Sequence, residues 1–414
     1  MRAIEKPDSL WRNRNFSILL AGQWVSQAGN TFYSLALYWF VLSATHSRAD
    51  LGLIGAATGI TGVLGLLSGA FVDRWNRRRT MLVTDAVRAV LSALIGVMAA
   101  LGHLPLWLLL VLVLALTAVG QFFGPAEAAL LPMVVAPEQL GSANGANQGS
   151  TASANLLGAT LGGACLGLFG PVALFFSNAA SFLVSVGSLG LLKVPEPARP
   201  VSPRGVGALL GEVGEGFSAI LANRFLLRVI LVGVVANFAV MPLNVLDVAW
   251  VRQVLHQGAL VYGLFGASIL IGILTGSAFA GLALRRLGMR TLLPGTIALA
   301  GLSVAALSQL PLLVPDLVLL FAFGVVVAIV NTSVTTAVQQ STPDSVLGRV
   351  MGTLMASVTL SIPLGALLSG YLATALPLST VFLGGGLLMC LSTGLALRLP
   401  APITGGREPT AASS

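Results

Sequence analysis

The feature that most limits how this chain can fold is a repeated series of apolar segments, each about 20 residues long or longer. Helices and closed barrels are the structures that satisfy backbone hydrogen bonds inside a bilayer. Only 9% of the residues are charged, whereas a soluble domain has about one quarter. We therefore predict an all-α membrane protein with twelve transmembrane helices. The predicted spans are residues 16–43, 51–72, 80–101, 105–131, 143–169, 171–192, 225–252, 259–284, 291–311, 315–339, 349–375 and 378–398.

One long polar interruption divides these spans into two sets of six. It is rich in proline at its start, which is unsuited to a helix. The sequence thus predicts an N-terminal six-helix bundle over residues 1–193, a cytoplasmic linker over 194–223, a C-terminal six-helix bundle over 224–400 and a cytoplasmic tail over 401–414.

The basic residues predict how the spans are oriented. If the N-terminus is cytoplasmic, 19 of the 22 lysines and arginines fall in cytoplasmic segments, two (Arg48 and Arg252) fall in outer loops, and Arg88 lies within a span. An excess of basic residues marks the cytoplasmic side. We therefore expect a multi-pass protein of the cell (plasma or inner) membrane, with both termini in the cytoplasm.

The two halves of the chain repeat each other. At a spacing of 211 residues, GLIGAATGI at 52–60 aligns with GLFGASILI at 263–271. At a spacing of 207 residues, Gly158-Ala159 aligns with Gly365-Ala366, and Gly163 with Gly370. Duplicated units related by pseudo-symmetry, with a binding site between them, are typical of transporters. Small residues recur on the repeated helices and let backbones approach closely, either as static packing or as surfaces that slide.

A dense group of charges lies between the second and third predicted spans, in the stretch SGAFVDRWNRRRTMLVTDAVRA at 68–89. The orientation of the spans accounts for the arginines of this loop. It does not account for an acidic residue at the end of a span. The pattern Gly-x-x-x-Asp-Arg-x-x-Arg-Arg resembles the loop signature of the major facilitator superfamily. The Asp and the Arg-Ala that follow it are similar to the macrolide-efflux-like branch of drug:proton antiporters. The residues concerned are Gly69, Asp73, Arg74, Arg77, Arg78, Asp85 and Arg88.

Two further segments, 124–145 and 242–267, resemble the connections of that branch. The resemblance implies a major facilitator fold of two pseudo-symmetric six-helix bundles. It also implies that the charged loop is a cytoplasmic gate, which latches the two bundles when the cavity opens outward. Ala159-Thr160 stands where such antiporters usually have Gly-Pro, and this departure leaves proton coupling open.

Polar side chains follow one face of the first predicted span and continue on the seventh. A polar helix face in a membrane must meet a cavity or a partner helix. In the family that the chain resembles, these two helices line the central cavity, which implies substrate contact; hydrogen bonds between packed helices are the alternative. The candidate substrate residues are Gln23, Gln27, Asn30, Ser34, Tyr38, Asn237, Met241 and Asn244.

Several ionisable residues lie within the predicted spans, where charges usually face the bundle interior and are paired. Asp85 and Glu127 are both possible partners of Arg88, either as a fixed ion pair or as part of a network that senses conformation. Asp247 has no basic residue at comparable depth except Arg252, which is nearer the surface. Such a carboxyl is suited to carry a proton or to attract a cationic substrate; the alternative is that it lies at the water interface and is solvated. Asp247 and Glu127 are therefore the candidates for proton coupling.

The sequence also narrows the classes of function. His46, His103 and His256 fall in separate loops without acids or cysteines at ligand spacing, so we expect no catalytic residue, no metal and no cofactor. Basic residues interrupted by apolar runs argue against nucleic acid. We expect a monomer in the lipid bilayer that exports an amphipathic small molecule, with protons as a possible second partner. A lysophospholipid, other lipid or siderophore transporter of the same fold is the alternative; a membrane enzyme or sensor is the alternative outside transport.

Overall fold

The computed structural model describes residues 9–72, 74–194, 218, 220–221, 223–342 and 344–397. Nine helical segments in this part of the chain are long and apolar enough to cross a membrane. The prediction of a helical, multi-pass membrane protein is therefore confirmed. Asp73, most of the predicted linker and the predicted tail lie outside the described residues.

The elements follow one another in chain order. They are η1 (Leu10–Arg12), α1 (Arg14–Thr45), α2 (Arg48–Val72), α3 (Arg77–Ala100), α4 (Leu106–Gly120), α5 (Phe123–Val134), η2 (Pro137–Gln139), α6 (Leu140–Leu191), α8 (Arg224–Gln253), α9 (Ala259–Leu287), α10 (Met289–Gln309), α11 (Leu313–Ser341), α12 (Asp344–Ala375) and α13 (Leu378–Leu397).

Two interruptions in the helices follow from local sequence. Within α6, Gly170 has φ 74° and ψ 173°, a conformation that is essentially restricted to glycine, and it lies between the predicted spans 143–169 and 171–192. Between α4 and α5, the predicted single span 105–131 is interrupted at 121–122. Pro125 has no N–H to donate to the Gln121 carbonyl four residues earlier, which explains the second break.

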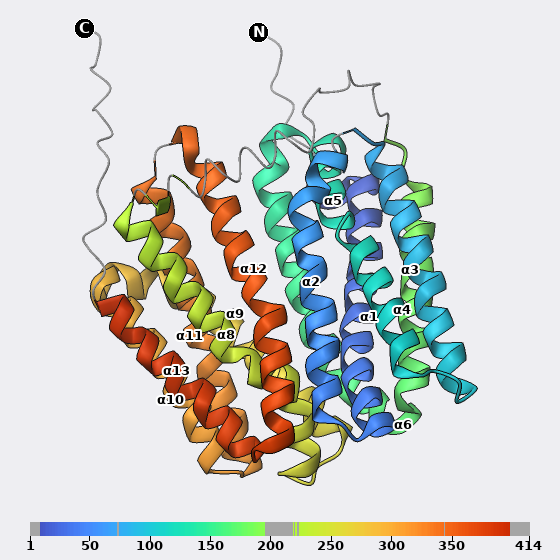
Figure 1. The fold of residues 1–414 in the computed structure, drawn as a ribbon. Helices are drawn as coiled ribbons and strands as arrows, with labels where there is room; N and C mark the ends of the chain where they lie inside the picture. The colour runs from blue at the N-terminus through green and yellow to red at the C-terminus, as the bar shows by residue number, and fades with distance from the viewer. Residues whose placement is uncertain are drawn as a thin grey trace, which may run out of the picture.

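The helices form two groups that lie side by side (Figure 1). We call α1 to α6 the N-group and α8 to α13 the C-group. The face where α1 and α8 begin is the terminal face, and the face where they end is the opposite face. Asn13 and Asn223 cap these two helix starts, accepting hydrogen bonds from the N–H groups of Phe16 and Phe225, as asparagine commonly does at an N-cap.

The two groups meet through α2 against α12 and through α6 against α9. In Figure 1, α2 and α12 converge toward the opposite face and diverge toward the terminal face. A Cβ atom at Gly52 would lie 2.8 Å from the Gly370 Cα atom, and one at Gly163 would lie 2.7 Å from the Gly263 Cα atom. Because the sequence repeat aligns Gly52 with Gly263 and Gly163 with Gly370, the two contacts are pseudo-symmetric counterparts.

Candidate functional site

Near the terminal face, glycines of the same four helices do not contact the other group. A Cβ atom at Gly69 of α2, Gly145 of α6, Gly281 of α9 or Gly352 of α12 would meet nothing within 4 Å. Asn144 and Gln148 in the first turns of α6 are exposed; such polar side chains are costly to place against lipid. The contacts on the opposite face, together with the divergence of α2 and α12 toward the terminal face (Figure 1), indicate a molecule that is closed on one face and open on the other.

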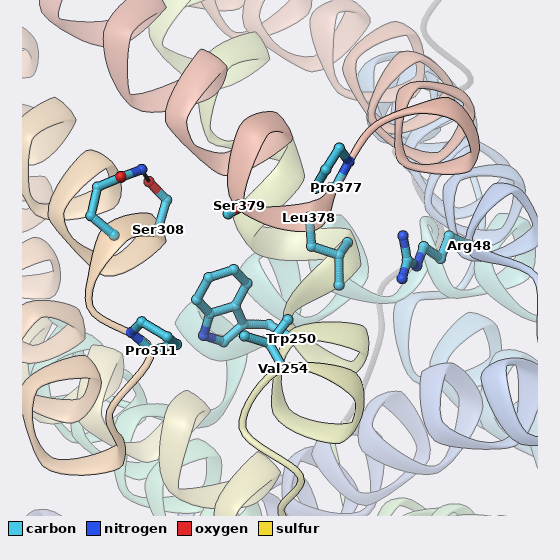
Figure 2. Close-up of a pocket in the computed structure, with 9 residues that line it drawn as sticks. Arg48, Trp250, Val254, Ser308, Pro311, Pro377, Leu378 and Ser379 are labelled. Atoms are coloured by element: carbon cyan, nitrogen blue, oxygen red, sulfur yellow. Dashed lines mark hydrogen bonds between the residues drawn. The ribbon is translucent and has the colours of Figure 1, made fainter.

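Two arginines join the groups on the closed face. Arg48 of α2 donates from Nε to Gln253 Oε1 at 2.8 Å and from Nη1 to the Ala373 carbonyl at 3.0 Å. Figure 2 shows it beside the turn between α12 and α13, at a cavity of about 450 Å³ around Trp250. Arg48 was placed in an outer loop by its sequence position, and the structure gives it partners in the C-group.

Arg252 of α8 makes the reciprocal connection. It donates from Nη1 to Ser43 Oγ of α1 at 2.6 Å. Its guanidinium carbon lies 4.7 Å from the centre of the Trp39 ring, a distance at which a cation is attracted to an aromatic face. Arg48 and Arg252 therefore reach in opposite directions across the closed face.

A cavity of about 610 Å³ lies within the C-group. Its lining residues come from α8 to α13, and on α8 they extend from Val229 to Asn244, about 22 Å at 1.5 Å per residue. Its volume is in the range of small-molecule binding sites, about 300–1,000 Å³. We call it the C-group cavity.

Amides and one hydroxyl interrupt the apolar wall of the C-group cavity. Asn237 and Asn244 line it from α8, and Asn331 and Thr335 line it from α11. Met241, the remaining candidate on α8, is instead buried and packs beside Gly365 of α12.

The polar stripe of α1 makes most of its contacts inside the N-group. Gln23 donates to Ser185 Oγ at 3.2 Å, and Gln27 donates to Asn155 Oδ1 at 2.9 Å, both on α6. These hydrogen bonds join two packed helices, and neither glutamine lines the C-group cavity.

The remaining α1 candidates lie nearer the opposite face. The exposed Ser34 hydroxyl donates to the Asn30 carbonyl at 3.0 Å. Tyr38 is half-buried, and the Cβ position of Gly55 is 3.5 Å from its hydroxyl oxygen. Asp247 is also half-buried; its Oδ1 accepts from the Val248 N–H at 2.7 Å. Val245, two residues earlier on α8, has its Cγ2 atom 2.8 Å from the Cβ position of Gly55 on α2, so this part of α8 lies at the boundary between the groups.

A buried ion pair lies in the N-group. Arg88 Nη1 is 3.4 Å from Asp85 Oδ1, and Arg88 Nη2 donates to Asn30 Oδ1 at 2.9 Å. The guanidinium carbon lies 4.1 Å from the centre of the Phe182 ring. Of the two possible acidic partners, the structure therefore pairs Arg88 with Asp85. Glu127 instead accepts from Asn147 Nδ2 at 3.3 Å.

The charged loop between α2 and α3 is tied to the N-group. Arg78 donates to the carbonyls of Leu189 and Gly190 at 2.7 and 2.6 Å, at the end of α6 where carbonyls lack helical partners. Arg77 is buried and lies 3.3 Å from Met133 Sδ. Arg74 is exposed. Asp73, the acid of this loop, lies outside the described residues.

The sequence analysis missed Asn331 and Thr335. They lie four residues apart in the stretch VVVAIVNTSVTTAVQQ, and residues at that spacing share a helix face. The signal was present, but it was weaker than the longer stripe on α1. None of the residues that the structure describes forms a cluster of three or more His, Cys, Asp or Glu suited to a metal ion.

Comparisons with known proteins agree with this architecture. A family model described as Major Facilitator Superfamily matches residues 19–355. The chain is 27% identical to the uncharacterized MFS-type transporter YvqJ of Bacillus subtilis, over 92% of this chain and 90% of that protein. It is 23% identical to macrolide efflux protein A of Streptococcus pyogenes, over 57% of this chain and 58% of that protein. Its fold is similar to the solved nucleoside transporter NupG, with a TM-score of 0.77, 14% identity and coverage of 93% and 99% of the two chains.

Proposed function

Because this chain belongs to the Major Facilitator Superfamily, we propose that it is a secondary active transporter that exports lipophilic or amphipathic small molecules by alternating access. The observation that supports this most is the asymmetry of the contact between its groups. Pseudo-symmetric glycine pairs and two arginines hold the opposite face together, while α2 and α12 diverge toward the terminal face (Figure 1) and the glycines there make no such contact.

The proposal includes the topology. Twelve helices span the membrane when α4 and α5 count as one span and α6 counts as two, divided at Gly170. Both termini are cytoplasmic, because the basic residues concentrate on the terminal face, and the protein is a monomer in the cell membrane. The conformation described here is then inward-open.

The proposal also assigns roles to the ionisable residues. Asp247 lies two residues from Val245, which packs against the other group, and Glu127 lies beside the first turns of α6. Movement of one group relative to the other changes the surroundings of both carboxyls, so they are our candidates for proton coupling. The gate residues between α2 and α3 lie on the face that closes in the outward-open state.

Export is favoured over import by the likeness to macrolide efflux protein A. A transporter of lysophospholipids or other lipids is the second candidate, supported by the mostly apolar wall of the C-group cavity.

The test is expression in a drug-sensitive bacterial host lacking its own major exporters, followed by tolerance to a panel of macrolides and lipophilic dyes. We expect at least a fourfold rise in the inhibitory concentration of several compounds. The control is Gly263→Trp, which places a bulky ring where a Cβ atom would already lie 2.5 Å from the Ala159 carbonyl oxygen. No rise across the panel, combined with co-purification of a lipid, would favour the second candidate.

A further inference from the structure

The C-group cavity carries no charge on its wall. None of the 23 residues that line it in the described part of the chain is acidic or basic. Most are Val, Ile, Leu, Met or Phe, and the polar lining side chains are three asparagines and one threonine. Asp85, Arg88 and Glu127 belong to the N-group, and Asp247, three residues beyond Asn244 on α8, does not line the cavity.

The periodicity of the lining residues shows that the polar groups face the cavity from two sides. On α8, Gly233, Asn237 and Asn244 lie at i, i+4 and i+11, on one helical face. On α11, Asn331 and Thr335 lie at i and i+4. A ligand between α8 and α11 meets amides on both sides.

These amides have unused hydrogen-bonding capacity. Asn244 and Asn331 are exposed and line the cavity, and neither side chain makes a hydrogen bond to any described residue. Asn237 donates from Nδ2 to the Gly233 carbonyl at 3.0 Å, which leaves its Oδ1 available as an acceptor. An amide both donates and accepts, so the wall suits neutral carbonyl, hydroxyl or amide groups.

A permanent cation is poorly accommodated in such a cavity. Moving an ion from water into a site without a counter-charge carries a large free-energy penalty. Amide oxygens compensate for only part of this penalty. An uncharged molecule of the same shape loses little on entry and gains from the apolar wall.

The shape of the ligand, by contrast, is only weakly constrained by the cavity wall. Met351, Met355 and Met389 all line the cavity. Methionine is flexible and polarisable, and it is common at binding surfaces that accept many partners. The wall can therefore adapt to ligands of different outline.

From these observations we infer that the C-group cavity is a binding site for uncharged lipophilic molecules with hydrogen-bonding groups, and that it discriminates among ligands by charge rather than by shape. This inference rests on the proposed function and specifies the substrate class.

Two dyes with the same ring system test it. Nile red is neutral and has a ring carbonyl, where Nile blue has a cationic iminium group. Binding to purified protein in detergent is measured by the change in dye fluorescence. We expect saturable binding of Nile red, and binding of Nile blue that is at least tenfold weaker.

Substitutions in the cavity wall assign the binding to this site. Asn331→Leu removes hydrogen bonding at similar volume and should weaken Nile red binding about two- to tenfold, the worth of one hydrogen bond. Asn331→Asp supplies a counter-charge and should strengthen Nile blue binding at least fivefold. The control is Asn15→Asp, which adds the same charge at the start of α1 near Lys193 and should change neither affinity.

Tighter binding of Nile blue than of Nile red by the wild type would overturn the inference, and so would an equal effect of Asn331→Asp and Asn15→Asp. If host tolerance nevertheless rises, the exporter function stands and the substrate class is wrong. Absence of binding of either dye together with no rise in tolerance would overturn both.

Discussion

At the scale of single residues, Arg88 is held by three neighbours of different chemistry. It contacts the buried Asp85 carboxylate, the Asn30 amide and the face of the Phe182 ring. The sequence placed Arg88 inside the membrane near two acids, but it could not choose between them, because both lie within reach of a long side chain. The choice depends on the packing of α5, whose Glu127 accepts a hydrogen bond from Asn147 of α6, and this packing appears only in three dimensions.

Removing Arg88 alone should destabilise the protein. Arg88→Met leaves Asp85 buried and unpaired, and we expect the free energy of unfolding to fall by about 3–5 kcal/mol. The double variant Asp85→Asn, Arg88→Met removes both charges and should recover most of this loss. Denaturant unfolding in detergent measures the difference, and equal destabilisation in the single and double variants would contradict a stabilising pair.

The proton-coupling candidates can be separated from the binding site. Asp247→Asn should abolish gradient-driven uptake, in inverted vesicles, of a compound identified by the tolerance panel. Nile red binding should stay within twofold, because Asp247 does not line the C-group cavity. Glu127→Gln is the parallel variant. Unchanged uptake in both variants would eliminate both residues as proton carriers.

At the scale of helices, periodicity predicted which residues share a face but not which neighbour that face meets. The stripe on α1 does lie on one face, and Gln23 and Gln27 direct it toward α6. The pair Asn331 and Thr335 on α11 meets a cavity instead. A polar face in lipid requires a polar environment, and either a helix or a cavity meets that requirement.

The glycine contacts give a sharper prediction for α9. Gly263→Leu introduces a side chain where a Cβ atom would lie 2.7 Å from the Gly163 Cα atom, while Gly281→Leu on the same helix meets nothing within 4 Å. Backbone atoms cannot move aside as a flexible side chain can. We therefore expect Gly263→Leu to reduce transport at least tenfold and Gly281→Leu to reduce it less than twofold, measured as dye efflux from loaded cells. Equal activity of the two variants would show that the α6–α9 contact does not limit transport.

At the scale of the whole molecule, the duplicated sequence was the most informative feature. The repeat aligns Gly52 with Gly263 and Gly163 with Gly370. In the structure, Gly52 meets Gly370 and Gly163 meets Gly263 across the boundary between the groups. The conformation could not be predicted, because the sequence of a protein that alternates between two conformations encodes both of them. The cavity could not be predicted either, since its wall combines residues from six helices.

Alternating access requires that one face closes when the other opens. Pulsed electron–electron distance measurements test this directly. In a Cys165→Ser, Cys390→Ser background, one spin-label pair at His46→Cys and Gln257→Cys reports on the opposite face. A second pair at Glu138→Cys and Arg286→Cys reports on the terminal face. In the variant that also carries Arg48→Ala and Arg252→Ala, the first distance should be longer than in the protein with both arginines. The second distance should be shorter. Distances that change in the same direction, or that do not change, would contradict transport by rocking of two groups.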